Sequence, residues 1–340
     1  MVTAWEQGCP KSMRFGPCGG VEPDGTCELG DRSCPFVELD WSDPAIAAPR
    51  ARQQPEPVGL SSILVDVRAP RDPVDLRDYW LAISDALQGA GALIGEHADN
   101  RVSDDAGTTP TEQVIEWLAT HGVQVWVTIT GRHRTVEQAA VLMSRYRDAG
   151  AAVMHCVTGD HPAAMGVAGA VAFGAESFTL SAAATEQGLT VSVAESPAAP
   201  GQRALRLARK EQAGAAACVL NHSGDIGRLV EFVAEVRRRG CTLPVLAPVP
   251  MVSDARHATA LVGLPGLLLP PGMIERISSS PDPHRTAMGV ATEQIASISE
   301  TGVFHGCNLS GGSRFDSARE RIDLTARYVT TALANWQAPA

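Results

Sequence analysis

The feature that most constrains the fold of this chain is a regular alternation of short apolar runs and amphipathic stretches between Ser61 and Trp336. Eight such runs occur, and a stretch of helical periodicity follows each of them. Continuously apolar runs are typical of parallel strands that are buried on both faces. Eight strand–helix units predict an α/β fold, a (β/α)8 TIM barrel. They fit a barrel better than the alternative, an open doubly wound sheet, because no G-x-G-x-x-G and no P-loop is present.

The same pattern gives the expected element boundaries. Strands are predicted over 61–70, 92–99, 123–130, 151–160, 189–196, 216–224, 242–250 and 302–311. Helices are predicted over 75–88, 111–120, 136–149, 163–173, 202–213, 226–239, 255–262 and 318–336, with an additional helix over 285–300.

Composition and charge exclude several classes of protein. Hydrophobic residues make up 44% and charged residues 19%, which is normal for a globular chain and excludes a disordered or collagen-like one. The formal net charge of −10 argues against a nucleic-acid partner and an anionic membrane surface. Since no long apolar stretch and no basic-then-apolar leader occur, we expect a cytoplasmic protein without a membrane partner.

Four of the eight cysteines lie close together near the start of the chain, and this cluster defines a second domain. We expect a cysteine-rich module over 1–46, a proline-rich linker over 47–59 and the barrel over 60–340. The other four cysteines lie singly in apolar segments, where small buried core residues are the expectation.

The clustered cysteines predict a metal site. Cys9, Cys18, Cys27 and Cys34 are separated by nine, nine and seven positions, with glycine and proline beside them and little apolar material between. So small a segment needs a covalent or metal cross-link. Four thiolates bind Zn²⁺ or a [4Fe–4S] cluster, and disulfides or free thiols are the alternative. This module is the surface through which we expect a protein partner or a second copy of the chain to dock.

Polar side chains gather where the predicted strands end, which is where barrels of this kind place their chemistry. Two carboxylates and an amide, Asp66, Asp160 and Asn221, suit a planar heterocycle with donors and acceptors on its edge, such as a pterin. The ordinary polarity of strand ends is an equally good explanation at any single position. The other strand-end candidates are Arg68, Glu96, His97, Asp99, Asn100, Thr128, Thr130, Arg132, His133, Gly159, His161, Glu195, His222 and Asn308.

These residues resemble the methylenetetrahydrofolate reductase family over most of Ser61 to Trp336. VDVRAPR resembles the family's first strand, with Asp66 in place of its acidic residue. TITGRHRT and HCVTGDHP resemble the third and fourth strand ends, and they put Asp160 at the aspartate that hydrogen-bonds flavin and pterin in the family. RKEQAGAAACVLNHSGD resembles the segment that ends in a pterin-binding glutamine, whose place Asn221 takes.

Two further segments extend the resemblance. APVPMVSD and NLSGG resemble the seventh and eighth strand ends, which implies that Met251 contacts the substrate. CPKSMRFGPCGG is similar to a cysteine module that accompanies some bacterial members of the family, usually after the barrel rather than before it.

Departures from the family pattern concern the cofactor. Asp66 and Asn221 are each one methylene shorter than the family's residues, Thr128 replaces a histidine that meets the flavin, and Glu195-Ser196-Pro197 stands for His-Pro-Glu. They favour a folate site over a flavin site. The cofactor-binding candidates are Thr128, Thr130, Arg206 and Lys210. The last two are four apart on one predicted helix and are expected to reach a phosphate or a glutamate tail, or else to form a solvated basic face.

The resemblance implies reduction of 5,10-methylenetetrahydrofolate to 5-methyltetrahydrofolate by NAD(P)H, with or without FAD. The expected roles are a general acid for Asp66 and an anion that binds the pterin and faces the iminium cation for Asp160. A folate-dependent one-carbon transferase that uses the same pocket is the alternative, and a non-catalytic subunit that docks through the cysteine module is a third hypothesis.

Overall fold

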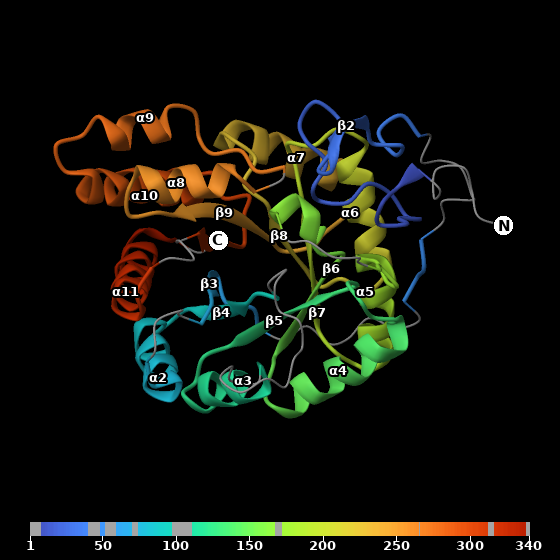
Figure 1. Ribbon diagram of the computed structural model, residues 1–340, viewed down its shortest axis with the longest axis horizontal. Helices are drawn as coiled ribbons and strands as arrows, with labels where there is room; N and C mark the ends of the chain where they lie inside the picture. The colour runs from blue at the N-terminus through green and yellow to red at the C-terminus, as the bar shows by residue number, and fades with distance from the viewer. Residues whose placement is uncertain are drawn as a thin grey trace.

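The computed structural model describes residues 8–39, 48–51, 59–69, 74–96, 111–166, 172–264, 266–311 and 316–337. Eight parallel strands close into a barrel in the order β10-β3-β4-β5-β6-β7-β8-β9, and helices surround it (Figure 1). The strands are β3 Ile63–Val67, β4 Gly91–Ile94, β5 Val125–Thr130, β6 Val153–Val157, β7 Val191–Glu195, β8 Ala217–Leu220, β9 Val245–Met251 and β10 Gly306–Gly311. The predicted TIM barrel is confirmed, and the open sheet is wrong.

Closure depends on β10, which pairs with both β9 and β3. Cys307 pairs with Ala247 on one side and with Ile63 on the other. Gly306 begins this strand, and a Cβ there would lie 2.0 Å from the Ser62 carbonyl oxygen, so only glycine fits. The first and last strands are therefore joined at a point where the backbones approach too closely for any side chain.

The helices form the outer layer, and their apolar faces cover the strands. They are α2 Leu76–Ala86, α3 Thr111–Thr120, α4 Val136–Asp148, α5 Ser177–Glu186, α6 Arg203–Gln212, α7 Ile226–Arg238, α8 Ala255–Val262, α9 Met273–Ser278, α10 Pro283–Glu300 and α11 Ala318–Asn335. Side-chain caps define several of their starts: the Asp75, Thr135, Asp225 and Ser317 side chains accept hydrogen bonds from first-turn N–H groups. None of the helices within the described residues is long and apolar enough to cross a bilayer.

Apolar side chains fill the interior of the barrel and close the bottom of the cavity at the carboxyl ends of the strands. Leu64, Leu93, Trp126, Val153 and Leu246 form one buried cluster together with residues of β8. Side chains two positions apart on a strand share a face, so Asp66, Thr128 and His155 point to the same side as Leu64, Trp126 and Val153. The polar residues thus lie one layer nearer to the carboxyl ends of the strands.

The α-helix predicted over 163–173 is wrong at both of its described ends, and residues 167–171 lie outside the described residues. A short 3₁₀ turn, η2 Pro162–Met165, occupies its start and ends at Gly166, whose φ is +70°. The helix of this unit is α5, which begins after Glu176. Most of its side chains are buried, so it lacks the polar face that makes helical periodicity visible in a sequence.

The cysteine-rich segment forms an antiparallel pair, β1 Thr26–Cys27 and β2 Gly30–Ser33, drawn in blue near the top of Figure 1, and it is hydrogen-bonded to Arg203 of α6. The expectation that it lacks apolar material of its own is wrong. Met13, Val21 and Phe36 are almost fully buried and form a small core with Cys18 and Cys34, into which Ala199 of the barrel packs. Of the predicted linker 47–59, only 48–51 and 59 lie within the described residues.

Candidate functional site

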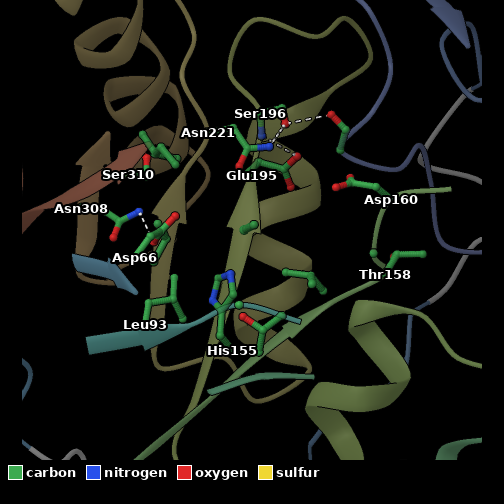
Figure 2. A pocket seen from close by; sticks show the side chains of 18 of the residues that line it. Asp66, Leu93, His155, Thr158, Asp160, Glu195, Ser196, Asn221, Asn308 and Ser310 are labelled. Atoms are coloured by element: carbon green, nitrogen blue, oxygen red, sulfur yellow. Dashed lines mark hydrogen bonds between the residues drawn. The ribbon is translucent and has the colours of Figure 1, made fainter. Parts of the chain in front are cut away.

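A cavity of about 320 Å³ opens at the carboxyl ends of the strands, where the sequence predicts the site. Figure 2 shows Asp66 and Asn308 on one side of it, Asp160 on the other, and Asn221, Glu195 and Ser196 between them. The predicted residues that line it are Asp66, Arg68, Glu96, Thr128, Thr130, Gly159, Asp160, Glu195, Arg206, Lys210, Asn221, His222 and Asn308. Met251 is buried in the core at the end of β9, outside this lining. His97, Asp99 and Asn100 lie outside the described residues.

Asp66 is held by one amide and lies above apolar side chains of the barrel interior. The Asn308 Nδ2 donates a hydrogen bond of 3.2 Å to Asp66 Oδ1, and Leu93, its pairing partner on β4, lines the same cavity and is buried. Burial raises the pKa of Asp66 to about 6, although Arg68 and the Asn308 hydrogen bond act in the opposite direction. This carboxyl group can therefore hold a proton near neutral pH and release it.

Asp160 has a different environment on the opposite wall. It follows β6 directly after Thr158 and Gly159, is exposed to solvent and lines the cavity. Gly159 has a φ of +91°, and a Cβ there would meet the Thr130 side chain at 3.0 Å, so the turn that carries Asp160 needs glycine. The two carboxylates of the site thus differ in exposure: one is embedded among apolar side chains, and the other faces solvent.

Glu195, at the end of β7, is the most deeply buried charge of the site. Its carboxylate forms ion pairs with Arg203 at 3.3 Å, Arg206 at 2.8 Å and Lys210 at 2.9 Å, all of them on α6 and at most 3% exposed. Burial alone would raise the pKa of Glu195, but these three cations hold it well below its usual range. Burial and Arg206 lower the pKa of Lys210 to about 8.

This cluster corrects one interpretation of Arg206 and Lys210: they are not a solvated basic face. Both are spaced to reach Glu195, and Lys210 also donates to the Ala194 carbonyl oxygen. Within the described residues the Arg206 Nε has no hydrogen-bond partner. The cluster carries three positive charges against one negative, and it lines the cavity through Glu195, Arg206 and Lys210.

Sequence reasoning missed several residues of the lining. His155 on β6 and Ser310 on β10 point into the barrel, and Lys11 and Gly19 come from the cysteine-rich segment. His155 Nδ1 lies 2.6 Å from Ser192 Oγ, and burial lowers the pKa of His155 to about 4, so its ring is neutral at pH 7. The position of His155, two residues after the buried Val153, was the available signal, because inward-facing residues of a strand alternate.

The four clustered cysteines converge without pairing. All four line one small cavity of the module and are free thiols. Burial raises the pKa of Cys34 to about 11. Among the described residues no group of three or more His, Cys, Asp or Glu side chains is arranged to hold a metal ion. The four thiols therefore lie around one small cavity, but the described side chains are not arranged as a metal coordination sphere.

Comparison with known proteins decides the family. The sequence profile of methylenetetrahydrofolate reductase matches residues 94–310. This chain belongs to the methylenetetrahydrofolate reductase family. A second profile, described as the methylene-tetrahydrofolate reductase C terminal, matches residues 3–43, which include all four clustered cysteines. A segment named for the end of other family members therefore precedes the barrel here. A search of curated proteins gives no match.

Two solved structures are similar to this chain, and the first of them, with a TM-score above 0.5, supports the fold. An uncharacterized protein from Clostridium thermocellum, which binds two copies of 5-methyl-5,6,7,8-tetrahydrofolic acid, matches with a TM-score of 0.56 and 11% identity, over 79% of this chain and 94% of that one. A mutant tryptophan synthase alpha-subunit from Pyrococcus furiosus matches with a TM-score of 0.43 and 11% identity, over 81% of this chain and 98% of that one.

The family implies FAD, and the described residues do not fit it well. Arg206 and Lys210, the cations predicted to reach a phosphate or a glutamate tail, are buried and bound to Glu195. Thr128 lines the cavity where the family's histidine meets the flavin.

The Glu195 cluster generates a stability prediction. Replacing Glu195 with Gln leaves three buried cations without a counter-charge, which costs about 3–5 kcal/mol for a buried ion pair that loses one partner. We expect urea denaturation to show a loss of that size. The matched control is Glu235→Gln on α7, whose exposed ion pairs with Arg238 and Arg239 contribute about 0–1 kcal/mol. Equal losses in the two variants would contradict the buried-cluster interpretation.

Proposed function

We propose that this protein reduces 5,10-methylenetetrahydrofolate to 5-methyltetrahydrofolate with a hydride from NAD(P)H. Family membership supports a folate reductase, and the observation that carries the proposal is the placement of Asp66 and Asp160. They face one cavity from opposite sides and differ in environment: burial raises the pKa of Asp66 to about 6, whereas Asp160 is exposed to solvent. Pairs of carboxylates with different environments are typical of sites that need both an acid and an anion.

The chemistry assigns the first proton to Asp66. The five-membered ring of the substrate must open before reduction: its N10 takes a proton as the bond from the methylene carbon to N10 breaks, leaving an iminium cation on N5. A carboxyl group with a pKa of about 6 supplies that proton near neutral pH. Asn308, which donates to Asp66 Oδ1, fixes the orientation of the carboxyl group.

Asp160 and Asn221 are proposed to bind the pterin. An ionised carboxylate accepts hydrogen bonds from the N–H groups of the pterin ring and faces the positive charge that forms on N5. The Asn221 Nδ2 donates to Ser196 Oγ at 2.7 Å, which fixes the amide and leaves its Oδ1 and second N–H for the ligand. The hydride of NAD(P)H then adds to the iminium carbon, giving the N5-methyl group and NAD(P)⁺.

A direct hydride transfer without flavin is the form of the reaction that we propose. It is supported by Thr128 in the cavity and by the engagement of Arg206 and Lys210 with Glu195. The test is the absorbance spectrum of the purified protein, combined with NADH and NADPH oxidation in the presence of 5,10-methylenetetrahydrofolate. We expect a protein without flavin absorbance that oxidises the nucleotide only when the folate is present. Folate binding without nucleotide oxidation would instead indicate the one-carbon transferase.

The acid assignment predicts a pH-dependent rate. The reaction needs protonated Asp66, so kcat should fall about tenfold per pH unit above its pKa of about 6. Asp66→Asn keeps the shape but has no carboxyl proton to deliver, so we expect kcat to fall about 10²–10⁴-fold with a much smaller change in KM. The measurement is steady-state kinetics across pH 5–9. A variant with near-normal turnover would assign the proton to another group.

The pterin assignment predicts a binding defect. Asp160 is exposed and makes no contact in the core, so Asp160→Ala should leave the unfolding midpoint unchanged. We expect its Kd for 5-methyltetrahydrofolate to rise more than tenfold, because charge-assisted hydrogen bonds contribute about 1.5–3 kcal/mol. Isothermal titration calorimetry measures this, and a Kd within twofold of the wild-type value would remove Asp160 from the site.

The cysteine cluster is proposed to bind one metal ion, with Zn²⁺ as first choice and a [4Fe–4S] cluster as the alternative. Loading would deprotonate Cys9, Cys18, Cys27 and Cys34 and draw their sulfur atoms together from the cavity that they share. Elemental analysis should find about one zinc per chain, or iron with acid-labile sulfide. Cys18→Ser should release it and expose the segment to protease. A metal-free protein with four titratable thiols would rule out the site.

A further inference from the structure

We infer that the cysteine-rich module, residues 8–39, supplies one wall of the folate pocket, so that Gly19 and Lys11 determine what the barrel binds. This rests on the proposed function and adds a second part of the chain to the site. The cavity at the strand ends is lined by Lys11 and Gly19 as well as by barrel residues. Neither residue belongs to a predicted strand end, and both lie in the segment 3–43 that the second profile matches, outside the barrel profile over 94–310.

Gly19 lies against the residue proposed to bind the pterin. Its carbonyl oxygen accepts a 3.2 Å hydrogen bond from Ser196 Oγ, the same hydroxyl that receives the Asn221 amide. Figure 2 shows this link as the dashed line from Ser196 to the N-terminal segment drawn in blue. A Cβ on Gly19 would lie 3.5 Å from Asn221 Nδ2 and 3.6 Å from Ser196 Oγ. A side chain there is free of backbone strain and would extend beside Asn221.

Lys11 reaches the other pterin-binding residue. Its Nζ donates a 2.8 Å hydrogen bond to the Gly159 carbonyl oxygen, directly before Asp160, and its ammonium forms an ion pair with Glu28. Only 3% of its side chain is exposed. Lys11 therefore fixes the turn that presents Asp160, from a position 148 residues away in the sequence. It is a positioning residue, whereas Gly19 borders the ligand space itself.

Buried hydrogen bonds hold this wall in place. Arg203 donates to the carbonyl oxygens of Pro17 and Cys18 while it pairs with Glu195. On the other flank, the carboxylate of Glu176 accepts from the backbone N–H groups of residues 14 and 15. The residues directly before Gly19 are thus fixed to the barrel by groups that would be left unpaired and buried if the module moved away.

The Gly19 wall is tested by a size series. Gly19→Ala, Gly19→Val and Gly19→Leu should raise the Kd for 5-methyltetrahydrofolate progressively, to more than tenfold for leucine, as the side chain extends beside Asn221. Asp31→Leu, on the exposed face of β2, is the matched control and should bind as the wild type does. Unfolding midpoints of all variants should agree, since no core contact changes. Unchanged binding by Gly19→Leu overturns the inference.

The Lys11 contact is tested by a double-mutant cycle. The pair Lys11→Met/Glu28→Gln removes both buried charges together, so that neither is left unpaired, and it should raise the folate Kd several-fold. The same pair introduced into Asp160→Ala should have no further effect if Lys11 acts by positioning Asp160. Additive losses would overturn that role. If the wild-type protein does not bind 5-methyltetrahydrofolate, the proposed function fails and this inference with it; if it binds and the module variants bind equally, the inference alone fails.

Discussion

The buried carboxylate of Glu195 is the interaction on which the rest of the site depends. One group at the end of β7 gathers three cations from α6 and thereby fixes the helix to the strand. Isolated charges at this depth are unfavourable by several kcal/mol each, and they are tolerated only when paired and hydrogen-bonded. Because Arg203 also donates to Pro17 and Cys18, the same carboxylate anchors the cysteine-rich module. The ion pairs of Glu195 therefore stabilise both the end of β7, which lines the cavity, and the cysteine-rich module, which forms one of its walls.

This arrangement divides the carboxylates of the cavity by function. Glu195 is surrounded by cations and stays ionised, so it is unsuited to donate a proton. Asp66 has one amide and one more distant arginine against apolar neighbours, and burial keeps its pKa near 6. Asp160 faces solvent beside Lys11. Glu195, Asp66 and Asp160 thus have three different environments in one cavity, which is how a small site combines a structural anion, an acid and a ligand-binding anion.

The barrel was predictable from sequence because its signal is local and repeated. A continuously apolar strand or an amphipathic helix can be recognised from about ten consecutive residues. Because the carboxyl ends of the strands of a barrel lie at the same end, the sequence alone placed Asp66, Asp160 and Asn221 in one site. The α5 helix was not predictable in this way, because a helix buried on most sides has no polar face. The burial of Arg206 and Lys210 could not be predicted either. A spacing of four residues on a helix is compatible with a basic surface patch and also with two cations that pair with a buried carboxylate from another element.

The sequence could not predict that the cysteine-rich module forms one wall of the cavity, and the reason is physical. Most of its hydrogen bonds with the barrel are made by its backbone groups: the carbonyl oxygens of Pro17, Cys18 and Gly19, and N–H groups at residues 14 and 15. Such contacts depend on the path of the chain, which the glycines, prolines and clustered cysteines determine, and not on a side-chain pattern. A segment that docks in this way needs only to reach the strand ends of the barrel. Its place before the barrel in this chain therefore does not prevent it from contributing Lys11 and Gly19 to the lining of the cavity.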